Sequence, residues 1–73
     1  MIRITDPDNT AAALGELRAR TGLTRRRFAE PTPVHEQRYG QYELGRRTPG
    51  IANLVRIARA HGYDLALIPR EDE

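Results

Sequence analysis

The sequence predicts a mainly α fold, a single compact domain of four helices with a short β-strand at each end. Apolar residues recur at helical spacing in several short segments, and Gly or Pro separates these segments. The chain has 73 residues, which is too short for more than one domain and allows only a thin core. It contains no cysteine, so neither a disulfide nor a zinc–thiolate site can support that core. Dimerisation is the common remedy that remains.

The first strand and the first helix are predicted in the amino-terminal third. Residues 1–5 alternate apolar and polar side chains, which predicts a short strand. Pro7 then suits the start of a helix over about 7–20, because proline is favoured in a first helical turn. The apolar stripe of this helix includes Leu14, and Gly22 can end it in a left-handed conformation.

The second and third helices are short, and a proline-containing turn separates them. Thr24 is suited to cap the second helix. Pro31 and Pro33 stop it, because proline donates no backbone hydrogen bond and restricts the residue before it. The third helix is predicted over 35–44, with an apolar inner face and a polar outer face. The pair forms a helix-turn-helix over 24–45, in which one helix can enter the major groove of DNA while the other crosses the backbone.

The fourth helix has the clearest periodicity. Thr48-Pro49 suits its start, and Gly62 its end. Residues 63–68 alternate well enough to predict the second strand. The domain is therefore expected to span 1–70, with the acidic residues 71–73 as a disordered tail. The fourth helix places apolar side chains at i, i+3, i+4 and i+7, which are Ile51, Leu54, Val55 and Ala58.

Several motifs fall on these helices in a recognisable order. They are Leu23-Thr24, Ala29-Glu30, Val34, the run Tyr42-Glu43-Leu44-Gly45-Arg46-Arg47-Thr48-Pro49, and Leu54-x-x-Ile57-Ala58. Together they resemble the Cro/XRE family of helix-turn-helix proteins, over about residues 10–62 without a gap. The Tyr-Glu-x-Gly-x-Arg-Thr-Pro run is the most specific part. The predicted terminal strands are similar to the compact antitoxin branch that includes HipB-like proteins. The resemblance implies a compact four-helix Cro/XRE-like domain.

The resemblance also implies which residues contact DNA. Its base-contacting positions at the start and outer face of the third helix correspond to Glu36, Gln37 and Gln41. Glutamine can pair with adenine, and glutamate can accept a hydrogen bond from cytosine N4. Contacts to phosphate set the register of the protein without recognising sequence. The positions implied to make them are Thr24, Arg25, Arg26, Arg38, Arg46 and Arg47.

Four residues of the helix-turn-helix depart from the family pattern: Pro31, which shortens the second helix, Tyr39, which stands where the family has a branched aliphatic residue, Pro33 and Gly40. Pro33 stands where the family has a glycine with positive φ, which proline cannot adopt, so the turn must be rebuilt. Gly40 lies in the middle of the third helix and costs about 1 kcal/mol of helix stability relative to alanine. These departures leave open an alternative function, a protein-interaction module on the same fold that has lost its recognition of DNA. His35 is expected either to cap the third helix or to contact a phosphate.

Composition excludes most enzyme classes. The chain has no Ser, Cys or Lys, so the commonest covalent nucleophiles are missing. His35 and His61 are far apart in sequence and have no cysteine beside them, so we expect no metal and no cofactor, and we do not expect an enzyme. The formal net charge is +2, and all 12 basic residues are arginine. Arginine suits phosphate and guanine, although a GC-rich coding genome would produce the same composition.

These observations predict a sequence-specific, DNA-binding transcriptional regulator, most simply a repressor of its own promoter. Two roles stay open, a phage Cro-like regulator and the antitoxin of a toxin–antitoxin pair. The expected partners are a palindromic double-stranded operator, a second copy of the chain in a homodimer, and, for an antitoxin, a cognate toxin protein. A dimer would place two recognition helices one DNA turn apart. No segment approaches the length of a membrane span or resembles a signal sequence, so we expect a cytoplasmic, nucleoid-associated protein.

Overall fold

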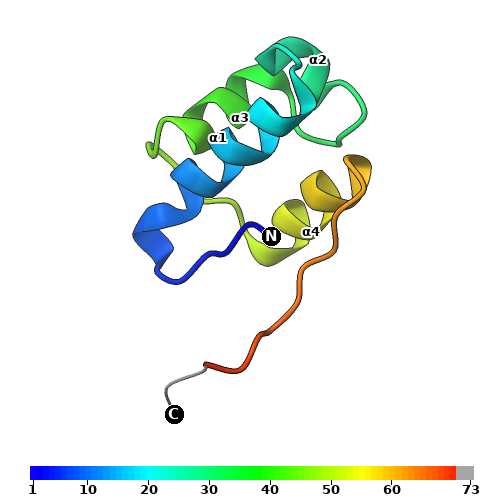
Figure 1. The fold of residues 1–73 in the computed structure, drawn as a ribbon. Coiled ribbons are helices and arrows are strands. Elements are labelled where there is room, and N and C mark those ends of the chain that lie inside the picture. Colours follow the sequence, from blue (N-terminus) through cyan, green and yellow to red (C-terminus); the bar gives the residue numbers. More distant parts are fainter. Residues whose placement is uncertain (71–73) are drawn as a thin grey trace.

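The computed structural model describes residues 1–70, and it confirms the four predicted helices (Figure 1). The predicted acidic tail, 71–73, lies outside the described residues. A short 3₁₀ turn precedes the first helix. In chain order the elements are η1 (Pro7–Asn9), α1 (Thr10–Thr21), α2 (Arg25–Ala29), α3 (Glu36–Glu43) and α4 (Ile51–Ala60).

Local sequence accounts for both ends of the first helical segment. Asp6 has an extended backbone, and its carboxylate accepts a hydrogen bond from the Asp8 N–H at 2.8 Å, which starts η1. At the other end Gly22 has φ 72° and donates its N–H to the carbonyls of Arg18 and Ala19. A residue with a Cβ rarely adopts that left-handed conformation, so the predicted glycine terminus is confirmed.

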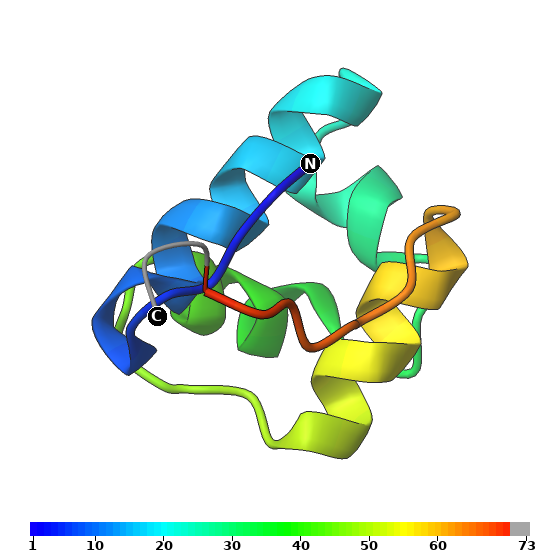
Figure 2. The ribbon, with the colours of Figure 1, turned by 60° about the horizontal axis from the view of Figure 1, so that its bottom comes forward.

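The core lies where the four helices converge. Phe28 of α2, Tyr39 of α3 and Ile57 of α4 are completely buried, and α3 packs against both α1 and α2. Figures 1 and 2 show α1 and α3 as neighbours, with α4 beside them. The rest of the buried cluster comes from the predicted apolar faces and consists of Leu14, Leu17, Ala29, Val34 and Tyr42.

The two predicted terminal strands are not confirmed. Residues 1–5 and 63–70 contain no strand, and no backbone hydrogen bond joins the two segments. A strand exists only through hydrogen bonds to a neighbour, and alternation in sequence cannot show whether the chain brings one into register. The segments instead meet at an apolar hollow, which Ile2, Tyr63 and Leu65 help to line, and the carboxyl-terminal segment then leaves the helices (Figure 1).

The fourth helix begins later than predicted. Its first residue is Ile51, and its N-cap is Gly50, whose extended backbone has ψ 164° and whose position has no capping side chain. Pro49 is buried in front of the helix instead of forming its first turn. As a result Ile51, which was predicted to belong to the apolar stripe, lies at the helix start with 72% of its surface exposed.

Candidate nucleic-acid interface

The turn between α2 and α3 is closed by a threonine. The Thr32 hydroxyl donates to the carbonyl of Ala29 at 2.7 Å and accepts from the Val34 N–H at 3.1 Å. The Thr32 N–H also donates to the Ala29 carbonyl at 2.9 Å. Within residues 1–70 only glycines have positive φ, so Pro33 is accommodated without the left-handed residue that it cannot supply. The turn is rebuilt around a side chain, as the presence of Pro33 required.

Side chains cap both helices of the pair at their amino-terminal ends. The Thr24 hydroxyl accepts a hydrogen bond from the Arg27 N–H at 3.2 Å, which confirms the predicted cap of α2. His35 caps α3, because its Nδ1 accepts from the Gln37 N–H at 3.1 Å. The hydroxyl hydrogen of Thr24 remains available to an external acceptor, since a hydroxyl can donate while it accepts.

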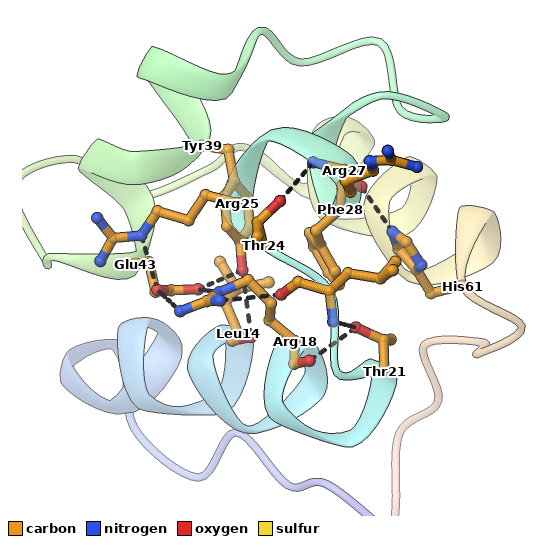
Figure 3. Close-up of polar contacts among 11 residues, drawn as sticks. Leu14, Arg18, Thr21, Thr24, Arg25, Arg27, Phe28, Tyr39, Glu43 and His61 are labelled. Carbon is orange, nitrogen blue, oxygen red and sulfur yellow. Dashed lines mark hydrogen bonds and ion pairs between the residues drawn. The ribbon is translucent and has the colours of Figure 1, made fainter.

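A single carboxylate holds α3 against α1 and α2 from the inside. Arg18 of α1 binds both oxygens of Glu43, through Nε to Oε2 at 2.8 Å and through Nη2 to Oε1 at 3.0 Å. Nε of Arg25, on α2, donates to Oε1 at 2.9 Å. The Tyr39 hydroxyl donates to Oε2 at 2.7 Å. Figure 3 shows the three side chains converging on Glu43, whose side chain is only 8% exposed.

Protonation of this cluster follows from its geometry. Burial by itself would raise the pKa of Glu43, but the hydrogen bonds from Arg18, Tyr39 and Arg25 outweigh it and lower that pKa to about 2. Burial, with the hydrogen bond to the carboxylate, raises the pKa of the Tyr39 phenol. Glu43 is therefore a carboxylate and Tyr39 a neutral donor at neutral pH.

The opposite face of α3, with the loop that follows it, carries four of the nine predicted DNA-contacting residues. Gln37, Arg38, Gln41 and Arg47 line one polar surface hollow together with His35. Gln37 and Arg38 are exposed, whereas Gln41 is half-buried. The loop after α3 is tied back to the helix, because the backbone N–H groups of Arg46 and Arg47 both donate to the Gln41 carbonyl, at 2.9 and 3.3 Å. We call this surface the outer face of α3.

Glu36 does not share that hollow. It lies in a neighbouring one over the turn, together with Arg26, Glu30 and Pro33, and His35 is common to both hollows. The structure thus brings two of the three predicted base-contacting residues into one surface and places the third at its edge. Arg46 is exposed on the loop but lines neither hollow.

Most of the predicted phosphate-binding arginines are available. Within residues 1–70 no ion pair engages Arg26, Arg38, Arg46 or Arg47. Arg25 differs, because its Nε binds Glu43 while its two terminal nitrogens have no partner among the described residues. In Figure 3 these nitrogens point away from Glu43. Arg25 can therefore be positioned by the interior carboxylate and still offer two donors to an anion.

Sequence reasoning assigned no role to Glu43 or Arg18. Glu43 belongs to the most specific motif of the resemblance, but its partner lies 25 residues earlier in the chain. Neither helical spacing nor charge pattern could reveal that pairing. A weak signal existed in the acid itself, which sits near the carboxyl end of α3, where the helix dipole disfavours negative charge.

No group of three or more His, Cys, Asp or Glu side chains within residues 1–70 is arranged to hold a metal ion. Over the same range, no helix has the length and apolar character that crossing a membrane requires.

Comparison with known proteins identifies a family for the chain. A family model described as a helix-turn-helix domain matches residues 11–70 of the chain. No curated protein and no solved structure matches it. The matched range contains α2, α3, the turn between them and every predicted DNA-contacting residue.

Proposed function

The chain belongs to the helix-turn-helix domain family of the Cro/XRE type, and from that membership we propose that it is a sequence-specific, DNA-binding transcriptional regulator. The observation that carries the proposal is the division of α3 into two faces. Its inner face is fixed to α1 and α2 through Glu43, while its outer face presents Gln37, Arg38 and Gln41 beside Arg47. A rigid helix with an exposed polar face is suited to the major groove.

In this mechanism α3 enters the major groove, where the amides of Gln37 and Gln41 contact base edges. Glu36, at the rim of the same face, is proposed as a third base contact that accepts from cytosine N4. The donors proposed for phosphate are Thr24, Arg25, Arg26, Arg38, Arg46 and Arg47, which set the position of the helix on the duplex. Occupancy of a promoter then blocks access of the polymerase.

The proposal is tested by fluorescence anisotropy of the full chain against two labelled duplexes, the DNA upstream of its own gene and a scrambled duplex of equal composition. We expect tighter binding to the upstream duplex. Gln37→Ala removes one bidentate contact and is expected to reduce that preference about tenfold. Arg47→Ala is expected to weaken binding to both duplexes equally, and to reduce the slope of log affinity against log salt by about 0.9.

Arg59→Ala is the matched control. It removes the same charge from an exposed position on α4 that lines neither hollow, so affinity for both duplexes is expected to stay within about twofold of wild type. Equal affinity of the folded wild-type protein for both duplexes, with no effect of Gln37→Ala, would overturn sequence-specific regulation. Binding that is insensitive to salt, or found only with a protein partner, would favour a protein-interaction module instead.

We further propose that the regulator represses its own promoter, in the role of a phage Cro-like regulator or of an antitoxin with a cognate toxin. A reporter gene fused to the upstream DNA tests repression of the protein's own promoter. Reporter expression should fall when the protein is supplied and should recover when the Gln37→Ala variant replaces it. Co-purification of the product of an adjacent gene would support the antitoxin role over the Cro-like one.

We also propose that the regulator is a homodimer. The carboxyl-terminal segment supports this, because residues 64–70 donate no backbone hydrogen bond within the described chain and Leu67 is completely exposed. An extended, apolar segment with unpaired backbone groups can pair with another chain. The two-fold symmetry of such a pair matches a palindromic operator with half-sites about 34 Å apart. Sedimentation equilibrium should give twice the chain mass at micromolar concentration, and a monomer mass at every concentration would contradict the dimer.

A further inference from the structure

His35 occupies a central position on the candidate interface although the family resemblance gives it no settled role. It precedes α3, is exposed, and is the residue common to the two hollows. Arg26 and Glu36 share one hollow with it, and Gln37, Arg38, Gln41 and Arg47 share the other. A ligand that lies along the outer face of α3 must therefore pass the imidazole ring.

The capping hydrogen bond determines which ring nitrogen carries the hydrogen. Nδ1 of His35 accepts from the Gln37 N–H at 3.1 Å, and an accepting nitrogen carries no hydrogen of its own. This bond therefore assigns the hydrogen of the neutral ring to Nε2, the nitrogen that the cap does not use. No group within residues 1–70 accepts a hydrogen bond from this Nε2. His35 thus uses Nδ1 to accept the hydrogen bond that caps α3, while the N–H at Nε2 has no acceptor among the described residues.

We propose that His35 is a further DNA contact, which donates from Nε2 to a phosphate oxygen while Nδ1 continues to cap α3. A phosphate is the acceptor favoured here because the first turn of a helix attracts negative charge, and because His35 shares the second hollow with Arg38 and Arg47 and no carboxylate. In the first hollow Glu30 and Glu36 accompany Arg26, so the arginine-lined side of the ring is the one suited to an anion. The contact orients the start of α3 on the backbone and does not distinguish bases. This inference rests on the proposed DNA-binding function.

Two substitutions separate the cap from the contact. Asparagine is a strong N-cap residue, so His35→Asn keeps an acceptor for the Gln37 N–H. Its only side-chain donor, the amide NH2, lies closer to the backbone than Nε2 of the ring, so the variant loses the donor at the position of Nε2. Alanine at the same position loses both. Circular dichroism and thermal unfolding of the two variants should show that His35→Asn melts close to wild type and that His35→Ala melts lower.

The test is fluorescence anisotropy with the upstream and the scrambled duplex over a salt series. His35→Asn is expected to bind both about 5- to 10-fold more weakly than wild type, with the preference between them unchanged, since a hydrogen bond to a charged acceptor is lost. The salt slope should not change, because a neutral donor displaces no counterion, whereas Arg26→Ala should reduce it by about 0.9.

Three outcomes would overturn the inference. Wild-type affinity in His35→Asn would show that capping is the whole role of the residue. Weaker binding to the upstream duplex alone would make His35 a base contact instead of a phosphate contact. Absence of binding by folded wild-type protein to either duplex would remove the proposed function itself, a failure distinguishable from the first two because both of those require wild-type binding.

Discussion

The helix-turn-helix pair and the carboxyl-terminal segment differ in how many of their polar groups are hydrogen-bonded and how many of their apolar side chains are buried. In the pair, capping side chains bind the first turns of α2 and α3, Thr32 closes the turn, and Glu43 fixes the inner face of α3. In the carboxyl-terminal segment, residues 64–70 make no backbone hydrogen bond as donors within the described chain, and Leu67 has no cover. Within residues 1–70, the helix-turn-helix pair has partners for these groups and the carboxyl-terminal segment does not.

The outer face of α3 and the carboxyl-terminal segment are therefore exposed for different reasons. The outer face of α3 is exposed although its scaffold is fully satisfied, which is typical of a surface prepared for a polar ligand. The terminal segment is exposed because none of residues 1–70 covers it, which favours a second chain as its partner. If this account is correct, substitutions in the two regions should separate folding stability from association.

The largest effect is expected from Leu67→Asp. A buried leucine contributes about 1.5–3 kcal/mol, and a symmetric dimer buries two copies, so the dimer dissociation constant should rise about a hundredfold or more. Because Leu67 is completely exposed in one chain, the helical content should not change. Sedimentation equilibrium and circular dichroism measure the two properties. An unchanged dimer, or a loss of helix, would contradict the division between the regions.

Substitution of Glu43, which joins Arg18 and Arg25, should change the folding stability and not the association of two chains. Glu43→Gln removes the charge that Arg18 and Arg25 share, and we expect it to lower the free energy of unfolding by about 2–3 kcal/mol, less than for a fully buried pair because both arginines are partly exposed. Urea unfolding gives the value. Glu16→Gln, which breaks the exposed pair with Arg20, is the matched control and should change the free energy of unfolding far less, because solvent screens both charges. Equal effects of the two substitutions would mean that Glu43 does not hold the helices together.

The same carboxylate predicts a specific acid sensitivity. The pKa of Glu43 is about 2 in the folded chain against an ordinary 4.5, so the unfolded state binds the proton more readily. The stabilisation by Glu43 is therefore complete above about pH 4.5 and is lost as the pH falls toward 2. Thermal unfolding between pH 6 and 2 should show a steeper loss in wild type than in Glu43→Gln. Parallel curves would show that another carboxylate governs acid unfolding.

The smallest effect is expected from Gly40→Ala in the middle of α3. A Cβ at position 40 meets no atom within 4 Å, so the substitution should stabilise the helix by about 1 kcal/mol and raise Tm by several degrees. Gly45→Ala is the contrasting variant, because Gly45 has φ 76° and any side chain there is strained. Calorimetry should show the two melting temperatures moving in opposite directions. A lower Tm for Gly40→Ala would mean that α3 needs its glycine for packing.

Local sequence predicted the helices and most of their ends. Thr24 and Gly22 have side-chain or backbone properties that act within a few residues, so their capping roles could be inferred from position alone. Pro33 is enough to predict a rebuilt turn, but the local pattern does not identify Thr32 as the residue that closes it. The start of α4 was placed too early at Thr48-Pro49, because the burial of Pro49 depends on packing that the local pattern does not contain.

The features that sequence could not supply depend on contacts between distant residues. Alternation at the termini was real, but a strand also needs a partner in register, and the described chain provides none. The pairing of Glu43 with Arg18 spans 25 residues. The separation of Glu36 from Gln37 and Gln41 into different hollows arises from the path of the turn, which no periodicity along α3 could reveal.

The central claim is that the outer face of α3, with the first turn of α2 and the loop after α3, is the surface that binds DNA. Its most direct test is a titration of ¹⁵N-labelled protein with duplex DNA, followed by amide chemical shifts, because it locates binding without any substitution. We predict that the largest shifts cluster at residues 24–27, 35–41 and 46–48. Largest shifts within α4 and residues 61–70, or none in the folded protein at saturating duplex, would contradict the claim.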